Sequence, residues 1–401
     1  MTTRTLPCRL NALSLAATSV KRRRMITLSR KAAMVLLIVG TLTSNACSSS
    51  GSKNKNTSGL YLVLFGGKYG YTDKKGQLVI TPQFDVAMGF TEGLASVRPT
   101  RGPGTKVGFI DKTGKFVISP QFDMAWPFSE GLSQVTVGDK DGYIDKDGKM
   151  VIIPQFVQSM AFHDGVASAR IGGIRTSTSG QQWGFIDKTG GWVVNPSFNF
   201  VNDMSDGRSY VYLPRGGTCY ISKEAYAAKK DNAAYNPGCL NGSPFNGGGA
   251  FSEGYAPVQF ADPGNSKWGY IDHAGVNATT PYLDMAFSFS EGLARVRIGD
   301  KYGYIDQSGF HELGAGGGGN MERMRKTVIP PQFEDAHDLS EGLAAVRVGG
   351  KWGYIDKTGK MVINPQFDGA GEFSGDLGAV NVAGKWGYID KDGKYVWNPS
   401  N

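Results

Sequence analysis

Most of the chain repeats one sequence pattern, and this limits it to architectures built from similar units. The segment KWGYIDKTGK at residues 351–360 recurs as KWGYIDKDGK at residues 385–394. The copy at residues 351–360 is followed by an apolar triplet, a Pro-x-aromatic step and a version of Phe-Ser-Glu-Gly-Leu-Ala, and variants of this order recur along the chain. One glycine of that last motif marks the phase of nine units: Gly59, Gly93, Gly131, Gly165, Gly207, Gly254, Gly292, Gly342 and Gly375. The base spacing is 34 residues, and extra length falls in turns, where insertions cost little.

A single unit predicts a small antiparallel sheet. Residues 343–348 alternate between apolar and polar faces and contain β-branched side chains, which indicates a strand. After a glycine turn, residues 352–356 form a second strand, and a hairpin turn leads to a short third strand at residues 361–363. We expect Pro365 to end this strand because proline has no N–H for the ladder. Residues 368–375 are then a compact connection between units.

Three short strands cannot bury both faces of their own sheet, so neighbouring units must stack on one another. The sequence therefore predicts an all-β protein without a long helix, built as a tandem array of about nine three-stranded antiparallel β-repeats. Nine three-stranded units would make an unusual propeller, which favours an open superhelical, solenoid-like array. A closed, propeller-like ring is the alternative.

The recurring motifs resemble the bacterial WG-repeat family, also called KWG repeats, over residues 59–401. The tryptophan of the WG step is kept in four units, at Trp183, Trp268, Trp352 and Trp386. The fifth unit departs most, with Gly-Thr-Cys-Tyr-Ile at residues 217–221. The resemblance implies a β-rich repeat scaffold but no shared activity. We expect the tryptophans to pack in the core, although exposed rings could stack on sugars.

The first residues are typical of an export signal. Basic residues precede an apolar run at residues 32–42, which is about half of the ~20 residues that a membrane span needs. The run ends at Leu42, Cys47 follows five residues later, and a Ser/Asn/Gly-rich stretch comes after the cysteine. This arrangement resembles a bacterial lipoprotein leader and implies that Cys47 is lipidated; a soluble exported protein cut near Ala46 is the alternative. The expected parts are a leader (1–46), a flexible tether (47–58) and the β-repeat domain (59–401).

The net charge of +8, from 43 basic and 35 acidic residues, arises entirely in this leader. Eight basic and no acidic residues precede Cys47, so residues 47–401 carry 35 of each. The repeat domain as a whole therefore has no general attraction for nucleic acid. Local basic character is expected on the polar face of the first strand, at the equivalent positions Arg98, Arg170, Arg297 and Arg347. These arginines form a candidate ladder for an anion or acidic polymer; alternatively, their stems cover apolar neighbours on a solvated face.

Two cysteines remain in the repeat domain, Cys219 and Cys239. In an exported protein such a pair predicts a disulfide bond, because the compartment is oxidising. Two free buried thiols are the alternative.

The sequence contains no recognisable catalytic constellation, metal site or cofactor motif. Seven acidic residues recur once per unit, and this regular spacing predicts that each accepts backbone N–H groups at a turn: Glu92, Glu130, Asp164, Asp206, Glu253, Glu291 and Glu341. The Asp-Lys-Asp-Gly sequence at residues 145–148 is interpreted as a hairpin turn, since a calcium loop needs further oxygen ligands. The histidines are scattered, at His163, His273, His311 and His337. The glycine-rich residues 314–319 lack the lysine of a phosphate-binding loop.

The sequence therefore favours a non-enzymatic binding or scaffold lipoprotein on the periplasmic or cell-surface side of a membrane. Its expected partner is an envelope protein or an acidic or glycan polymer, with membrane contact only through the lipid anchor and no nucleic acid. The alternative is an envelope glycan hydrolase whose acids come from different repeats.

Overall fold

A computed structural model describes residues 58–172, 182–214, 216–222, 239–240, 245–261, 266–308, 310 and 327–398. These residues form strands and turns, without an α-helix among them. A search of the same residues for a helix long and apolar enough to cross a membrane gives none. The prediction of an all-β protein is confirmed.

The strands form nine separate antiparallel sheets, which we call blades 1 to 9 in chain order. Blade 1 contains β1 (Leu60–Phe65), β2 (Lys68–Asp73) and β3 (Leu78–Phe84). Blade 2 contains β4 (Val86–Ala87), β5 (Ala95–Arg98), β6 (Val107–Ile110) and β7 (Phe116–Phe122). Blade 3 contains β8 (Met124–Ala125), β9 (Ser133–Val137), β10 (Lys140–Ile144) and β11 (Met150–Phe156). Blade 4 contains β12 (Gln158–His163), β13 (Val166–Ile171), β14 (Gln182–Ile186) and β15 (Trp192–Phe198).

The later blades follow the same order. Blade 5 contains β16 (Phe200–Val201), β17 (Arg208–Tyr212) and β18 (Thr218–Ser222). Blade 6 contains β19 (Phe245–Gly248), β20 (Tyr255–Phe260) and β21 (Trp268–Asp272). Blade 7 contains β22 (Met285–Ser290), β23 (Leu293–Ile298), β24 (Lys301–Ile305) and β25 (Ile329–Phe333). Blade 8 contains β26 (Asp335–Ala336), β27 (Leu343–Val348), β28 (Lys351–Asp356) and β29 (Met361–Phe367), and blade 9 contains β30 (Gly369–Ser374), β31 (Leu377–Val382), β32 (Lys385–Ile389) and β33 (Tyr395–Trp397).

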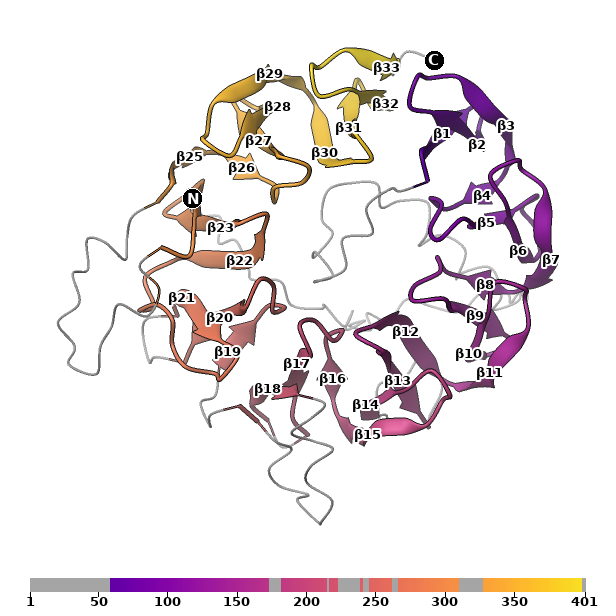
Figure 1. The fold of residues 1–401 in the computed structure, drawn as a ribbon, viewed down its shortest axis with the longest axis horizontal. Coiled ribbons are helices and arrows are strands. Elements are labelled where there is room, and N and C mark those ends of the chain that lie inside the picture. Colours follow the sequence, from indigo (N-terminus) through magenta and orange to yellow (C-terminus); the bar gives the residue numbers. More distant parts are fainter. Residues whose placement is uncertain are drawn as a thin grey trace, which may run out of the picture. The chain divides into compact units, whose positions relative to one another are not determined.

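The blades are arranged around a central axis as a propeller (Figure 1). The first strand of a full blade lies nearest the axis and the last strand lies on the perimeter, as β12 and β15 show in Figure 1. Blade 9 lies beside blade 1, so the array closes. The expectation of an open superhelical array is thus wrong, and the alternative of a closed ring is correct.

The repeat unit is also larger than expected, because six of the nine blades have four strands. The segment interpreted as a connection forms the innermost strand, β30 in blade 9 and the two-residue strand β26 in blade 8. Pro365 does not end the third strand, since β29 continues through it to Phe367. A proline fits there because the strand lies at the sheet edge and is bulged opposite Gly353. A Cβ on Gly353 would lie 2.7 Å from the Pro365 nitrogen, which explains the glycine of the WG step.

The hydrophobic core lies between blades. Tyr354 and Ile363 of blade 8 pack with Phe373 and Val380 of blade 9 in one buried cluster. The tyrosine ring of the WGY step packs edge-to-face against a phenylalanine of the next blade, with centroids 4.9 Å apart for Tyr354 and Phe373. The Tyr354 hydroxyl donates to the carbonyl of Gly371, so one side chain fills the core and satisfies the innermost strand of its neighbour.

The ring closes at a seam between blades 9 and 1, where Tyr61 takes an unusual role. At its position, the other eight units have Ala, Ser or Gly, which leaves room for the phenylalanine of the innermost strand. Blade 1 has no described innermost strand, and the Tyr61 ring lies 5.5 Å from the ring of Tyr388 instead. The Tyr61 hydroxyl donates to the carbonyl of Gly375 in blade 9. Tyr61 therefore replaces the missing phenylalanine at the seam.

Candidate functional site

The recurring acidic residues lie in the tight turns that join the first two strands of a blade. All seven predicted acids adopt a left-handed backbone conformation, with φ between 50° and 55°. In each case a glycine with positive φ follows, as Gly131 does after Glu130. This conformation is unfavourable for a residue with a Cβ, so an interaction of the side chain must compensate for it.

Each of these carboxylates accepts a hydrogen bond from the backbone of the equivalent turn in the next blade. Glu92 accepts from the Gly131 amide at 3.1 Å, and Glu291 accepts from the Glu341 and Gly342 amides at 2.7 and 2.9 Å. The other links are Glu130 to Gly165, Asp164 to Gly207, Asp206 to Gly254, Glu253 to Gly292 and Glu341 to Gly375. The prediction that these acids cap turns is confirmed. We call the seven residues the acidic collar.

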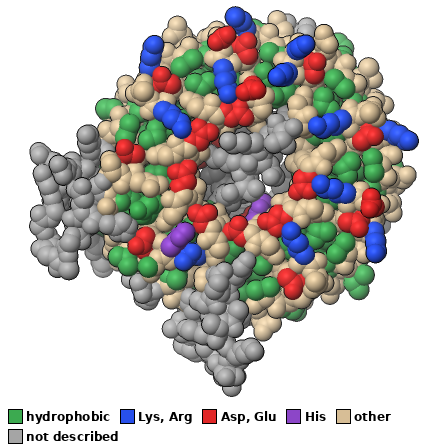
Figure 2. Space-filling view, viewed as in Figure 1, with side chains coloured by type: hydrophobic (Ala, Val, Ile, Leu, Met, Phe, Trp, Pro, Cys, Tyr) green, Lys and Arg blue, Asp and Glu red, His purple; other side chains and the backbone are tan. Residues whose placement is uncertain are grey.

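Lysines of the neighbouring blade neutralise part of this collar. Lys146 lies 3.0 Å from Glu92, and Lys188 lies 3.2 Å from Glu130. Both lysines come from the Asp-Lys-x-Gly hairpin turns, so these turns contribute cations to the collar. On the face shown in Figure 2, acidic side chains lie around the inner edge of the ring and basic side chains lie farther out. The collar is therefore a structural clasp with a mixed-charge surface.

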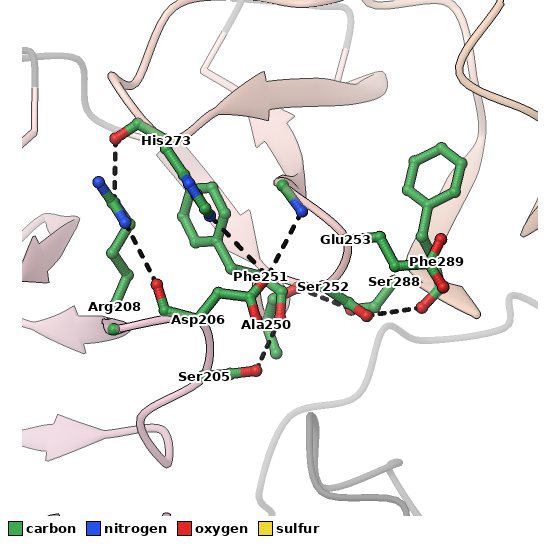
Figure 3. A network of polar contacts seen from close by, with 12 residues as sticks. Ser205, Asp206, Arg208, Ala250, Phe251, Ser252, Glu253, His273, Ser288 and Phe289 are labelled. Carbon is green, nitrogen blue, oxygen red and sulfur yellow. Dashed lines mark hydrogen bonds and ion pairs between the residues drawn. The ribbon is translucent and has the colours of Figure 1, made fainter. Parts of the chain in front are cut away.

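The collar changes its chemistry between blades 5 and 6 (Figure 3). Here His273 occupies the lysine position, and its Nε2 atom lies 3.8 Å from the Asp206 carboxylate. Arg208 donates from Nε to the His273 carbonyl at 2.9 Å, and its guanidinium lies 5.6 Å from the Phe251 ring centroid. The Asp206 link to the Gly254 amide is 3.4 Å, the longest among the seven links. Titratable and aromatic groups thus replace the simple lysine clasp in this sector.

A second departure lies between blades 4 and 5. Burial raises the pKa of the Asp203 carboxyl above its ordinary value, and the nearby His163 lowers it again in part. His163 stands where other units have the serine or threonine of the Phe-Ser-Glu-Gly motif. That serine elsewhere donates to a carbonyl of the next blade, as Ser129 does to Phe162 at 2.7 Å. The structure thus places His163 near the Asp203 carboxylate. The position of His163 in the sequence, far from the other histidines, did not indicate this.

The third departure, between blades 7 and 8, was missed by sequence reasoning. Arg295 lies 3.3 Å from Asp338 and its guanidinium lies 3.6 Å from the Phe287 ring centroid. Burial, followed by the charge of Arg295, lowers the pKa of His337, whose ring is 4.8 Å from that of Trp352. A comparison of the units would have marked Arg295 as unusual, because the equivalent residue of the next unit is Ala345.

The four arginines of the candidate ladder occupy equivalent positions in blades 2, 4, 7 and 8, but their environments differ. Arg98 donates from Nη2 to the Asp123 carbonyl of the next blade at 2.7 Å. Arg170 is buried and lies over Trp183 at 5.3 Å. Arg297 is half-buried, and Arg347 is exposed with its Nε 3.9 Å from Glu334. Their role in binding stays a prediction.

The four tryptophans of the WG steps differ in burial. Trp183 and Trp352 are buried, with 5% and 6% of their surface exposed. Trp268 is half-buried, whereas Trp386 in blade 9 is 37% exposed. The exposed ring is the one at the seam.

Cys219 and Cys239 form a disulfide bond, as the sequence predicted. Cys219 is buried in a cluster that includes Trp183 and Met204. The proposed lipidation site Cys47 and the tether at residues 47–57 lie outside the described residues, as do His311 and the insertion at residues 314–326. Within the parts of the chain that the structure describes, no group of three or more His, Cys, Asp or Glu side chains could hold a metal ion.

The sequence matches a known repeat family. The model of the family described as WG containing repeat matches residues 69–98, 108–140, 142–173, 183–213, 268–302, 322–352 and 352–386. These matches cover more than half of the chain. No curated protein sequence matches it.

Several solved structures are similar at low sequence identity. One is the extracellular domain of a one-component system from B. thetaiotaomicron, with 12% identity and a TM-score of 0.32 over 83% of this chain and 53% of that chain. Another is PorZ, a surface component of the type-IX secretion system of Porphyromonas gingivalis, with 12% identity and a TM-score of 0.31 over 83% and 44% of the two chains. The chain spans about half the length of both.

Proposed function

Because the chain belongs to the family of WG-containing repeat proteins, we propose that it is a non-enzymatic binding or scaffold module, exported and lipid-anchored, for a protein or polymer of the cell envelope. One observation carries this proposal. The recurring tyrosines and acids contact the neighbouring blade, as Tyr354 does with Gly371 and Glu341 with Gly375. The chemistry that recurs in each unit thus builds a rigid ring, which is what a docking platform requires.

Export is supported by the leader sequence and by the disulfide bond between Cys219 and Cys239. The proposed anchor is a lipid on Cys47, tested by labelling with palmitate. We expect the label on the wild-type protein and its loss in Cys47→Ala. An unlabelled wild-type protein would contradict anchoring and leave binding to be tested separately.

The partner is tested by crosslinking in intact cells, followed by recovery of the protein and identification of what is attached. Arg297 and Arg347 are the candidate contacts for an acidic polymer, since one is half-buried and the other exposed at equivalent positions of adjacent blades. We expect the double variant Arg297→Ser/Arg347→Ser to bind acidic envelope polymers at least tenfold more weakly. Arg208→Ser is a matched control, because Arg208 also lies over an aromatic ring but is outside the ladder. An unchanged affinity in the double variant would remove the ladder from the proposal.

A glycan hydrolase is a second candidate because of Asp203. A glycosidase needs an acid whose carboxyl stays protonated near neutral pH, and burial raises the pKa of Asp203 in that direction. Hydrolysis of envelope glycans that disappears in Asp203→Asn would favour this reading. A wild-type protein that releases no reducing ends would exclude it.

A further inference from the structure

Blade 1 differs from all the others on its axial side. In each of the other eight blades an innermost strand pairs with the next strand, as Val86 pairs with Arg98 and Ala87 with Val97 in blade 2. Among the described residues, β1 pairs with β2 alone. By repeat phase, Val63 and Leu64 hold the positions of Val97 and Arg98. The axial edge of β1 is therefore equivalent to the strand edge that pairs with an innermost strand in every other blade.

Apolar side chains are exposed around this edge. Leu64 and Phe65 are 52% and 53% exposed, although both belong to a strand. Across the seam, Trp386 is 37% exposed, whereas Trp352 at the same position of blade 8 is 6% exposed. Trp352 packs in a cluster with Ala370 of the next blade's innermost strand. An innermost strand in blade 1 would cover Trp386 in the same way.

The other blades show which residues such a strand needs. In five of the other eight blades it begins with an acidic residue, continues with any residue and then has an alanine, as in Asp85-Val86-Ala87 and Asp368-Gly369-Ala370. Blades 4, 5 and 6 depart from this pattern, blade 5 with Asn199-Phe200-Val201. The acidic residue binds twice. Its amide donates to the carbonyl of the adjacent strand, from Asp368 to Asn381 at 2.9 Å, and its carboxylate accepts from the following turn, from Ala383 at 2.7 Å.

The corresponding groups of blade 1 are the Leu64 carbonyl and the amides of the turn at Gly66 and Gly67. Within the described part of the chain, no carboxylate bonds to these two amides. Equivalent turns bind a carboxylate in four other blades: Gly138 to Asp123, Gly299 to Asp284, Gly349 to Glu334 and Ala383 to Asp368. The turn of blade 1 is thus matched to an acidic side chain.

We propose that the axial edge of β1 is a docking site for an extended peptide segment of a partner protein, which adds an innermost strand to blade 1. The segment carries the pattern acid-x-alanine. The backbone amide of its acidic residue donates to the Leu64 carbonyl, and the carboxylate of that residue accepts from the Gly66–Gly67 turn. Its alanine lies opposite Val63 and packs toward Trp386. This strand addition uses backbone hydrogen bonds for affinity and the alanine pocket for specificity. It deepens the proposed binding function by naming a polypeptide partner and a site.

The test uses a synthetic peptide copying residues 83–89, Gln-Phe-Asp-Val-Ala-Met-Gly, titrated into the full chain by calorimetry. We expect saturable binding and a blue shift of tryptophan fluorescence as Trp386 is covered. Replacing the peptide's aspartate by asparagine or its alanine by leucine should weaken binding at least tenfold. In the protein, Phe65→Ser should weaken binding, whereas Val348→Ser, the equivalent exposed position of blade 8, should not.

Absence of saturable binding, or equal binding of the leucine peptide, overturns the proposal. Slow amide exchange of Gly66 and Gly67 in the free protein also overturns it, because another part of the chain would then cover the edge. A concentration-dependent dimer that Phe65→Ser abolishes would assign the edge to a second copy instead. If crosslinking in cells finds a partner while the peptide fails, the binding function survives and this site does not.

Discussion

The Tyr388 hydroxyl of blade 9 donates a hydrogen bond of 2.9 Å to the Leu62 carbonyl of blade 1. The same interaction joins Tyr71 to Met88 and Tyr354 to Gly371 between other neighbouring blades. In those pairs the acceptor lies in or next to the innermost strand of the neighbouring blade. At the seam the acceptor lies in β1, which is equivalent to the second strand of a four-stranded blade, because blade 1 has no described innermost strand. Among the residues that the structure describes, the ring therefore closes by side chains across the seam, and the first and last blades share no strand.

Tyr61 should contribute more to stability than its exposed neighbours in β1. Its ring is buried against Tyr388, so Tyr61→Ala would leave a cavity at the seam and should cost about 3–5 kcal/mol, as large-to-small core substitutions do. Tyr61→Phe keeps the ring and loses the bond to Gly375, which should cost about 1 kcal/mol. Urea unfolding measures both. Equal stability of Tyr61→Ala and Leu64→Ala would contradict the closing role of Tyr61.

The acidic collar should differ in strength around the ring. Glu341 accepts from two amides at 2.6 and 2.8 Å and lies 3.4 Å from Lys391, whereas Asp206 has a single 3.4 Å amide link. Glu341→Gln should therefore lower stability by about 1–2 kcal/mol, and Asp206→Asn by less than about 0.5 kcal/mol. Thermal unfolding of the two variants provides the comparison. The opposite order would show that the collar does not hold the blades together.

The repeat, the all-β class and the turn-capping acids could be predicted because each follows from one unit. Closure could not be predicted, since it depends on the small rotation from each blade to the next, which no single unit shows. Some innermost strands were missed because they are short: β4 and β26 have only two residues, too few for a period-two pattern. The six-residue strand β30 was missed because its pairing is bulged between Ala370 and Phe373, which interrupts the alternation. The sequence around Pro365 did not indicate that the third strand continues, because an edge strand tolerates a proline that a central strand would not.

The residues that distinguish one blade boundary from another could be found only by comparing equivalent positions of the nine units. Arg295, His337 and Tyr61 are unremarkable by themselves, and each becomes informative beside the residues that fill the same place in other units. Their environments still needed the structure, because each contacts a neighbouring blade that the pattern alone does not position. Arg295 meets Asp338 across the boundary between blades 7 and 8, for example.

His337 should make stability depend on pH. Burial and Arg295 lower its pKa in the folded protein, so below the ordinary value of about 6.5 the unfolded chain binds more protons than the folded one. Stability should therefore fall as the pH drops from about 7 toward 5. The facing charges of Asp335 and Asp338 act in the opposite direction and reduce the effect.

The test compares wild type with His337→Met, since methionine stands at this position in blades 2 and 4 as Met88 and Met160. Urea midpoints at pH 7.5 and 5.5 should move apart less in the variant than in the wild type. An identical pH dependence in the two proteins would show that His337 does not carry the effect.

The disulfide bond between Cys219 and Cys239 should stabilise the most divergent unit. It links residues separated by 20 positions, and a loop of this size gives roughly 3 kcal/mol in the chain-entropy description. A reductant should lower the urea midpoint of the wild type and leave that of Cys219→Ala/Cys239→Ala unchanged. The unfolded wild-type chain should also release two more thiols after reduction than before it. Equal thiol counts would contradict the bond, and a midpoint insensitive to reduction would show that blade 5 is held by its contacts with blade 4, through the cluster of Cys219, Trp183 and Met204.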